Sequence, residues 1–234
     1  MSNQGSDVRE NTLQNQPEGL STEIFRLFLT VGTAPISDAL DKLGRHEQVM
    51  APGFAPVKDE MVIVGRSRTL TSAPRSGPID EGREYELLIE AIDDLDRGDV
   101  LVTDTTDCCV WGELCCERAG ARGSNGAVID GYHRDTKLVL ATGFPVVSRG
   151  RHVTDLLYKR QIVARDEIVN CGGVEVAPGD IIVADLDGVV VVPSAMVEKV
   201  AGEARAKFDT ESQVRKALRS GSSVREVWDT YQVL

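Results

Sequence analysis

The sequence has no apolar run close to the ~20 residues that a membrane-spanning helix needs. Its first residues, MSNQGSDVRENTLQNQPEG, lack the basic segment followed by an apolar one that marks a signal peptide. We therefore expect no membrane partner and a cytoplasmic location. Basic residues are in the minority, with 26 Lys and Arg against 37 Asp and Glu and a net charge of -11. Such a chain repels a phosphate backbone, so we expect no nucleic acid partner.

Cysteine and histidine are few, and their spacing does not suit a structural metal site. Five cysteines, an odd count, do not indicate a disulfide framework, and the two adjacent pairs lack the Cys-x2-Cys spacing of zinc sites. We expect the cysteine side chains to be small buried groups. The three histidines are scattered, and His133 is expected to be a partly exposed turn residue, with a proton shuttle as the alternative. The residues concerned are Cys108, Cys109, Cys115, Cys116, Cys171, His46, His133 and His152.

The remaining composition is that of an ordinary globular protein. Of the 234 residues, 41% are hydrophobic and 27% are charged, which fits one domain with tails. Residues 1–19 are polar and unpatterned, and we expect them to form a flexible N-terminal extension. Residues 20–193 are expected to form the α/β domain. Residues 194–234 would be a C-terminal helix and tail that pack on the domain or on a neighbouring subunit.

Apolar periodicity predicts the secondary structure. Helical spacing covers residues 21–43 with a break at 33–35, and then residues 84–95, 113–121 and 194–218. Short β-branched runs bounded by turn residues predict strands at 61–71, 100–104, 127–130, 146–148, 161–164, 174–176, 181–184 and 189–192. Alternating strands and helices followed by dense strands and a terminal helix indicate a layered α/β domain.

The position of three glycines argues against a site for NAD. Gly120, Gly123 and Gly126 follow the helix expected at 113–121, whereas a dinucleotide fingerprint has GxGxxG between a strand and the helix after it. We therefore do not expect NAD binding.

Reactive groups cluster at the ends of two expected strands. The segment 111–115, WGELC, joins a strand to a helix whose first N–H groups have no partner within the helix, so a small carboxylate could bind the N–H groups of Leu114 and Cys115. The alternative is that Glu113 caps its own helix. The helix start could also lower the pKa of the Cys115 thiol, although only its backbone is assigned a role.

The second group is Arg134 and Asp135, at the end of the strand that this helix leads to. The two strands of a β-α-β unit are parallel, so their carboxyl ends meet at one edge and both groups should border one crevice. Arg134 offers a fixed guanidinium, and Asp135 a carboxylate that could hold a hard divalent cation. The alternative is an ordinary surface pair, which sequence neighbours rarely make well; we favour a functional site.

These residues resemble a known signature. Gly112-Glu113-Leu114 followed twenty residues later by Arg134-Asp135 is similar to the class II pyruvate aldolases represented by 4-hydroxy-4-methyl-2-oxoglutarate/4-carboxy-4-hydroxy-2-oxoadipate aldolase, relatives of the regulator of ribonuclease activity A (RraA). Further segments match in order over roughly residues 20–233: 33–40, 98–102, 123–135, 145–146 and 176–193.

The resemblance implies a single-domain, layered α/β/β/α sandwich of the RraA-like, swivelling-domain-like type, assembled as a homotrimer or homohexamer with sites at subunit interfaces. It implies that Asp135 is the one direct protein ligand of Mg2+ or Mn2+ and that Arg134 polarises the keto oxygen of a 2-oxo acid. Residues Gly112, Glu113, Leu114 and Cys115 would line the substrate carboxylate. Glu113 would also activate a base water.

The implied activity is that of a divalent-metal-dependent carbon–carbon lyase on a small 2-oxo acid. It would cleave a 4-hydroxy-2-oxo acid by a retro-aldol reaction, decarboxylate oxaloacetate, or both, through the enolate of pyruvate. Leu138 stands where the aldolases usually carry an acidic residue, so the substrate is left open. A carboxylate from a neighbouring subunit is also implied, with Glu198, Glu203 and Glu211 as candidates. The alternative is a non-catalytic, protein-binding regulator like the ribonuclease regulator branch.

Overall fold

The computed structural model describes residues 15–104 and 107–233. Residues 1–14 of the expected N-terminal extension lie outside these ranges. Two of the five that follow are hydrogen-bonded to the domain: the side-chain amide of Asn125 donates to the carbonyl of Asn15 at 2.9 Å, and Gln16 donates to the carbonyl of Leu20 at 2.6 Å. In the described part of the chain, no helix combines the length and the apolar character that crossing a membrane would require.

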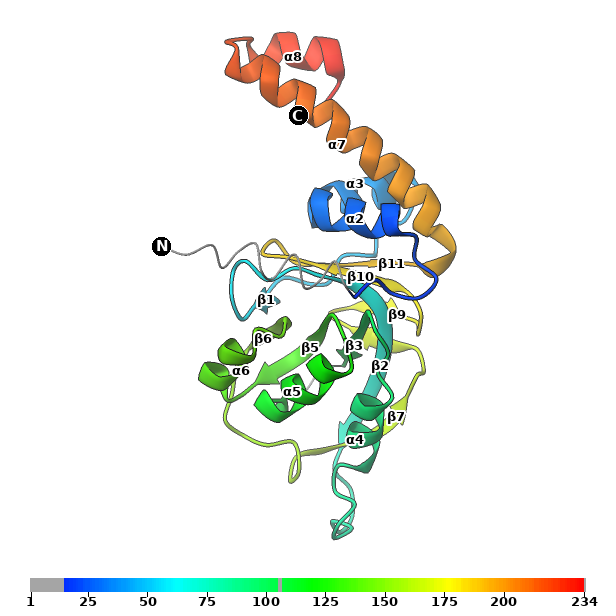
Figure 1. The fold of residues 1–234 in the computed structure, drawn as a ribbon, viewed down its shortest axis with the longest axis vertical. Coiled ribbons are helices and arrows are strands. Elements are labelled where there is room, and N and C mark those ends of the chain that lie inside the picture. The colour runs from blue at the N-terminus through cyan, green and yellow to red at the C-terminus, as the bar shows by residue number, and fades with distance from the viewer. Residues whose placement is uncertain (1–14, 105–106, 234) are drawn as a thin grey trace.

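A curled, mixed sheet forms the centre of the molecule (Figure 1). Its main path runs β1-β6-β5-β3-β2-β10-β11, with β4 paired to β5 and β7 paired to β2. The pairs β2–β3, β3–β5, β4–β5 and β5–β6 are parallel, and the remaining pairs are antiparallel. The strands are β1 (Ala55–Pro56), β2 (Ile63–Pro74), β3 (Asp99–Thr103), β4 (Cys109–Trp111), β5 (Gly126–His133), β6 (Val146–Arg151), β7 (Arg160–Arg165), β10 (Ile181–Ala184) and β11 (Val189–Val192), and a separate hairpin pairs β8 (Val169–Cys171) with β9 (Val174–Val176).

Helices cover both outer faces of the sheet. One group consists of α2 (Thr22–Val31), α3 (Thr33–Lys42) and α7 (Val197–Arg219), which follows the short 3-10 helix η1 (Ser194–Met196). The other group consists of α4 (Glu86–Asp93), α5 (Glu113–Ala121) and α6 (Thr136–Thr142). A final helix, α8 (Val224–Tyr231), begins at Ser223 with a capping box and folds back on the end of α7 (Figure 1).

Strand alternation produces three apolar layers. In β10, Ile181 and Val183 pack against α2, α3 and α7, whereas Ile182 and Ala184 face the interior of the curled sheet. In β5, Val128 faces that interior while Ala127 and Ile129 pack against the group that contains α4 and α5. Successive side chains of a strand point to opposite faces, so each half of the sheet has one helix-covered face and one face toward the other half. The expected single-domain α/β/β/α arrangement is therefore confirmed.

The elements differ from the predicted ones mainly in extent. The break in the first helical run lies at Gly32, with φ of 76°, so α3 begins at Thr33 and contains Pro35 in its first turn, where a missing N–H does no harm. The runs around 61–65 and 67–71 form one continuous strand, β2. The structure adds β1, β4, β8, α6 and α8, which the sequence analysis did not assign.

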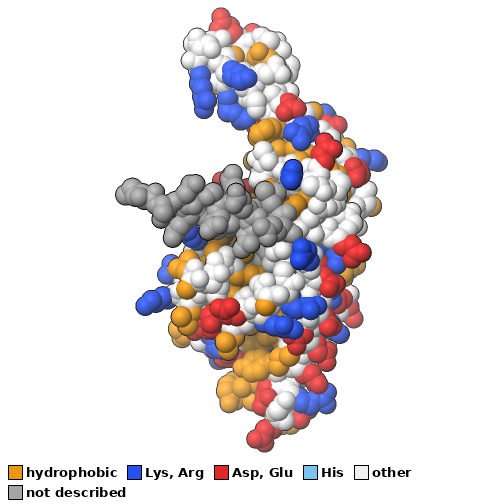
Figure 2. Space-filling model, in the orientation of Figure 1, with side chains coloured by type: hydrophobic (Ala, Val, Ile, Leu, Met, Phe, Trp, Pro, Cys, Tyr) orange, Lys and Arg blue, Asp and Glu red, His pale blue; other side chains and the backbone are white. Residues whose placement is uncertain are grey.

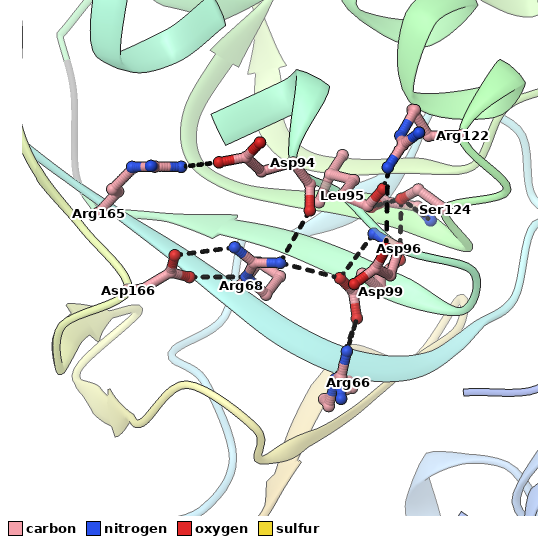
Figure 3. Close-up of polar contacts among 11 residues, drawn as sticks. Arg66, Arg68, Asp94, Leu95, Asp96, Asp99, Arg122, Ser124, Arg165 and Asp166 are labelled. Carbon is pink, nitrogen blue, oxygen red and sulfur yellow. Dashed lines mark hydrogen bonds and ion pairs between the residues drawn. The ribbon is translucent and has the colours of Figure 1, made fainter. Parts of the chain in front are cut away.

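A buried carboxylate joins β2, β3 and α4 (Figure 3). The side chain of Asp99 is fully buried and pairs with Arg66 at 3.0 Å and with Arg68 at 3.3 Å. Arg68 also donates to the backbone carbonyl of Asp94, at the C-terminus of α4, and to both carboxylate oxygens of Asp166. Arg165 pairs with the Asp94 side chain. These contacts fix the position of α4, which forms one wall of the pocket described next.

Candidate active site

A pocket of about 260 Å³ opens between α4, the β4–α5 junction and the end of β5. One wall is the apolar side of α4, with Leu88, Ile89 and Ile92. The opposite side carries Gly112, Leu114, Cys115, Arg134 and Asp135. Figure 2 shows apolar side chains gathered in the lower part of the view, the region of α4 and α5 in Figure 1.

The β4–α5 junction turns a strand directly into a helix. Gly112 is the N-cap of α5, with extended backbone angles, and no side chain caps the first turn. The predicted alternative, in which Glu113 caps its own helix, is therefore not observed. A Cβ added at Gly112 would lie 2.9 Å from the Asp135 carboxylate oxygen Oδ2, closer than real contacts allow. Glycine is thus needed to bring Asp135 against the N-terminus of α5, where uncapped N–H groups and the helix dipole favour an anion.

Arg134 lies beside this helix end and is held by a carboxylate. Its backbone N–H donates to the carbonyl of Trp111 at 3.0 Å, and its Nη1 pairs with Asp155 Oδ2 at 2.5 Å. Its Nε lies 3.7 Å from Asp135 Oδ2, so the pair formed by the two sequence neighbours is the weaker one. Burial is the largest single effect on Arg134 and opposes its charge, but Asp155, Cys109 and Asp135 together outweigh it, so the pKa of the guanidinium is raised.

Asp155 is a charged residue of this site that the sequence analysis did not identify. It accepts hydrogen bonds at Oδ1 from the Tyr85 hydroxyl at 2.7 Å and from the Leu157 N–H at 2.8 Å. Burial works against ionisation of this carboxyl, yet the Leu157 N–H, Tyr85 and Arg134 together lower its pKa. Burial, followed by the Asp155 contact, raises the pKa of Tyr85 to about 12. Asp155 lies between strands, at an isolated bridge to Cys109, so no periodic pattern in the sequence marks it.

Asp135 has an unusual backbone for a residue with a side chain. Its φ of 56° and ψ of 31° are left-handed, a region that Asp tolerates better than most residues and that is often found at functional sites. It is the N-cap of α6, but its side chain does not cap that helix, and it is 47% exposed. The carboxylate therefore points at the pocket instead of completing the local fold.

The donor set around Asp135 fits a hard divalent cation. Within the described ranges, no three His, Cys, Asp or Glu side chains gather into a group that could hold a metal ion alone. Mg2+ commonly uses one or two carboxylates and keeps several waters, with substrate oxygens completing its shell. One exposed carboxylate at the rim of a pocket meets that requirement, so Asp135 could hold Mg2+ or Mn2+.

Five of the six residues expected at the site line this pocket: Gly112, Leu114, Cys115, Arg134 and Asp135. Glu113 is the first residue of α5, half-buried, and is not part of the lining. The three candidates for the one carboxylate expected to reach a neighbouring subunit's site lie outside the pocket of their own chain, so that expectation stays a prediction. Glu203 pairs with Lys42, and Glu211 pairs with Lys207 and Arg215, while Glu198 lies in the first turn of α7.

Two expectations about nearby residues are wrong. His133 is not an exposed turn residue: it lies in β5, is 3% exposed, and its Nδ1 is 2.8 Å from the Ser148 hydroxyl. Burial lowers its pKa, because the interior disfavours the charged ring. The pKa of the Cys115 thiol is raised and not lowered, because burial outweighs the backbone N–H groups of Gly112 and Cys115 that favour the thiolate. The other four cysteines are buried, as predicted.

Comparison with known proteins identifies a family that this chain matches. Residues 33–191 match the RraA-like family, described as Aldolase/RraA. A "Putative 4-hydroxy-4-methyl-2-oxoglutarate aldolase" from Halalkalibacterium halodurans is 33% identical over 203 residues, which cover 85% of this chain and 90% of that protein. Protein DlpA from Legionella pneumophila is 29% identical over 213 residues, 89% of this chain, and the chain spans about a third (34%) of the length of that protein.

Solved structures show the same fold. An uncharacterized protein from Pseudomonas syringae pv. tomato is similar with a TM-score of 0.77 and 31% identity, over 89% of this chain and 98% of that one. Streptomyces coelicolor RraAS2, titled an unusual member of the RNase ES inhibitor RraA protein family, is similar with a TM-score of 0.74 and 27% identity, over 85% and 98%.

Proposed function

The chain belongs to the RraA-like family, and on that premise we propose that it is a divalent-metal-dependent carbon–carbon lyase for small 2-oxo acids. Relatives named as aldolases support an aldolase-type reaction. The proposed reaction is retro-aldol cleavage of a 4-hydroxy-2-oxo acid, decarboxylation of oxaloacetate, or both. Each releases the enolate of pyruvate, so one site could serve both substrates.

Substrate binding uses the β4–α5 junction and Arg134. The 2-oxo acid carboxylate would accept hydrogen bonds from the N–H groups of Leu114 and Cys115 at the N-terminus of α5. Gly112 leaves that end of the helix open. The keto oxygen would then face the Arg134 guanidinium, which Asp155 holds in place from the other side.

The chain's residues then stabilise the charge that develops. When the C3–C4 bond breaks, its electron pair moves toward C3 and the keto oxygen, while the proton of the C4 hydroxyl leaves and an aldehyde or oxo acid departs. Arg134 donates to that oxygen as it becomes negative, and a preorganised donor of this kind is typically worth about a hundredfold to a thousandfold in rate. A divalent cation on Asp135 would supply Lewis acidity at the same oxygen. Glu113 as the group that activates a base water remains a prediction, tested by the kcat of Glu113→Gln.

The observation that carries the proposal is one pocket that holds an arginine fixed by Asp155, an accessible carboxylate at Asp135 and an uncapped helix start at Gly112. The test is pyruvate release from oxaloacetate and from 4-hydroxy-2-oxo acids, with Mg2+ and with chelator. Arg134→Lys should lower kcat/KM at least about a hundredfold, because an ammonium is a point charge that cannot copy the guanidinium fork.

The matched control is Arg215→Lys on α7, whose side chain pairs with Glu211 outside the pocket. It should leave the rate unchanged. Pyruvate release that survives both chelation and Arg134→Lys without change would contradict the proposal.

A second candidate function is a protein-binding regulator. The likeness to RraAS2, over most of both chains, favours it, and a net charge of -11 would suit a basic partner. Binding of this kind needs no metal. A pull-down with a basic protein partner that persists in chelator, from a chain that releases no pyruvate, would support the regulator over the lyase.

A further inference from the structure

The pocket lining also indicates which C4 substituent the substrate carries, that is, the part released as the aldehyde or oxo acid. Resting on the proposed function, we propose that this chain prefers 4-hydroxy-2-oxo acids that carry an apolar C4 substituent, alkyl or aryl, and a single carboxylate. A substrate with a second or third carboxylate would be a poor one. The inference rests on two observations: the pocket wall is apolar, and the charged side chains of the lining are already paired with one another.

The wall that α4 forms is lined by apolar side chains from its helical residues. Leu88 and Ile92, one turn apart on α4, are 6% exposed each, and Ile89 between them is 57% exposed. On the same side as Arg134, Leu114 at the start of α5 adds an apolar side chain that is 78% exposed. These side chains present carbon to any group that extends from the bound 2-oxo acid. The remaining apolar lining is Val110, Trp111 and Leu156.

The cationic and hydroxyl donors of the lining are few and are already engaged. Among the described residues that line the pocket, Arg134 is the one cation, and it pairs with Asp155. The hydroxyl of Tyr85 donates to the same carboxylate. The substrate's own carboxylate takes the uncapped N–H groups of α5. A further carboxylate on the substrate would find no cation on the apolar wall.

The charge balance leads to the same conclusion. Arg134 faces two carboxylates, Asp135 and Asp155, so the charged lining has an excess of one negative charge. The proposed divalent cation at Asp135 would reverse this to an excess of one positive charge, which one substrate carboxylate neutralises. Each additional carboxylate would then lie against apolar side chains without a counter-charge, which costs part of its solvation without a compensating interaction.

The apolar wall cannot readily turn to offer a polar face. Helix α4 is held at its C-terminus by Arg68 and Arg165 on Asp94 (Figure 3) and by Arg118 on Asp93. Glu90, on the opposite side of the helix, lies 3.7 Å from Arg165. The wall is therefore preformed. Its apolar side chains would select among substrates and would not rearrange to fit them.

The experiment compares two substrates of nearly equal shape. One is 4-hydroxy-5-methyl-2-oxohexanoate, with an isopropyl group at C4, and the other is 4-hydroxy-2-oxoglutarate, with a carboxylate there. Cleavage is followed through pyruvate with Mg2+ present. We expect kcat/KM for the isopropyl substrate to exceed that for the carboxylate substrate at least about a hundredfold. Within an unbranched alkyl series, each added methylene should raise kcat/KM about fourfold until the pocket is full, from ~0.8 kcal/mol per buried CH2.

A variant on the wall should weaken the preference. Ile89→Arg places a cation on the wall at an exposed position that the fold tolerates, so cleavage of the carboxylate substrate should rise at least about tenfold relative to the isopropyl one. Ile168→Arg is the matched control, since Ile168 is 64% exposed and is not in the pocket lining. Its substrate ratio should equal that of the wild type.

A binding measurement gives a readout that does not depend on turnover. Trp111 lines the pocket, so its fluorescence in a Trp228→Phe background should respond to 2-oxohexanoate at lower concentration than to 2-oxoglutarate. Equal or tighter binding of 2-oxoglutarate, or equal or faster cleavage of the carboxylate substrate, would overturn the inference.

Deuterium exchange into the methyl group of pyruvate separates the two proposals, because it needs the enolate and no C4 substituent. Exchange without cleavage of the isopropyl substrate would overturn the inference and leave the enolate chemistry standing. Absence of exchange and of all cleavage would overturn the proposed function itself.

Discussion

At the scale of single residues, the site depends on side chains whose local geometry serves the pocket and not the nearest element. Asp135 occupies a helix N-cap position in a left-handed conformation without capping the helix. Gly112 leaves the start of α5 open. Arg134 points at Asp155, a partner from a distant loop, more closely than at its neighbour Asp135. Each departs from the locally favourable choice, which is typical of functional positions.

Gly112→Ala should reduce activity without unfolding the protein. The φ of Gly112 is accessible to alanine, but the new Cβ would lie 2.9 Å from Asp135 Oδ2 and would displace that carboxylate. We expect at least about a tenfold lower kcat and weaker Mg2+ activation. Gly120→Ala on the same helix meets Phe144 at an ordinary 3.6 Å and should stabilise the protein by about 0.5–1 kcal/mol with normal activity. If both variants behave alike in kinetics, the steric argument at Gly112 is wrong.

Asp135→Asn should weaken activation by Mg2+ at least about tenfold, because the amide removes the negative charge of the proposed ligand. Asp166 provides a matched control: it is also left-handed, with φ of 55°, and is paired with an arginine, Arg68, away from the pocket. Titration of pyruvate release with Mg2+ should shift for Asp135→Asn and stay at the wild-type midpoint for Asp166→Asn. An unchanged midpoint in both would remove Asp135 from the metal site.

Asp155→Asn should act through the position of Arg134 and should alter the pH dependence of stability. The pKa of Asp155 is lower in the folded state than its usual value of 3.8. The ionised carboxylate therefore stabilises the folded state fully above pH 3.8, and this stabilisation is lost as the pH falls through the lower folded-state pKa. In urea unfolding, the free energy of unfolding of the wild type should exceed that of the variant at pH 6, and this difference should become smaller toward pH 3. A tenfold to hundredfold lower kcat at neutral pH is expected, as for other supporting partners. A free-energy difference between wild type and variant that becomes larger at lower pH would contradict the lowered pKa of Asp155.

At the scale of elements, α4 forms the apolar wall of the pocket, and the buried Asp99 pairs with Arg66 and Arg68, of which Arg68 holds the C-terminus of α4 (Figure 3). Asp99→Asn should lower the free energy of unfolding by about 3 kcal/mol, because it leaves Arg66 and Arg68 without their buried counter-charge. Asp93→Asn breaks an exposed pair with Arg118 and should change it by less than about 1 kcal/mol. Chemical denaturation of both variants tests this, and equal effects would contradict the assigned role of Asp99.

The longer elements could be predicted from sequence, whereas the short ones that shape the site could not. Residues 22–31 carry five buried apolar side chains at helical spacing, and β2 has 12 residues, so the sequence identifies this helix and this strand. Strand β4 has three residues and α6 has seven, too few for a pattern, and both are fixed by tertiary contacts. The same holds for the site: parallel strands predict that 111–115 meets Arg134, but the Asp155 contact depends on a loop that no periodicity describes.

At the scale of the whole molecule, α7 and α8 extend away from the sheet (Figure 1). Val227 of α8 is 1% exposed, so part of the tail packs within the chain, while Trp228 and Val224 are 40% and 53% exposed. Exposed apolar groups of this kind suit subunit contacts.

The expected homotrimer or homohexamer remains a prediction of the resemblance. Light scattering of the purified protein should give three or six times the chain mass of 25.4 kDa. A mass of one chain at micromolar concentration would contradict the assembly, and with it the prediction that a carboxylate from a neighbouring subunit reaches the site.

The central claim is that Arg134 and a cation on Asp135 together stabilise the enolate of pyruvate. The most direct measurement is the exchange of pyruvate methyl protons for deuterium, followed by NMR with Mg2+ and with chelator. We predict exchange that requires Mg2+ and falls at least about a hundredfold in Arg134→Lys. Exchange at the same rate in wild type, in Arg134→Lys and in chelator, or no exchange above the uncatalysed rate in the wild type with Mg2+, would contradict the claim.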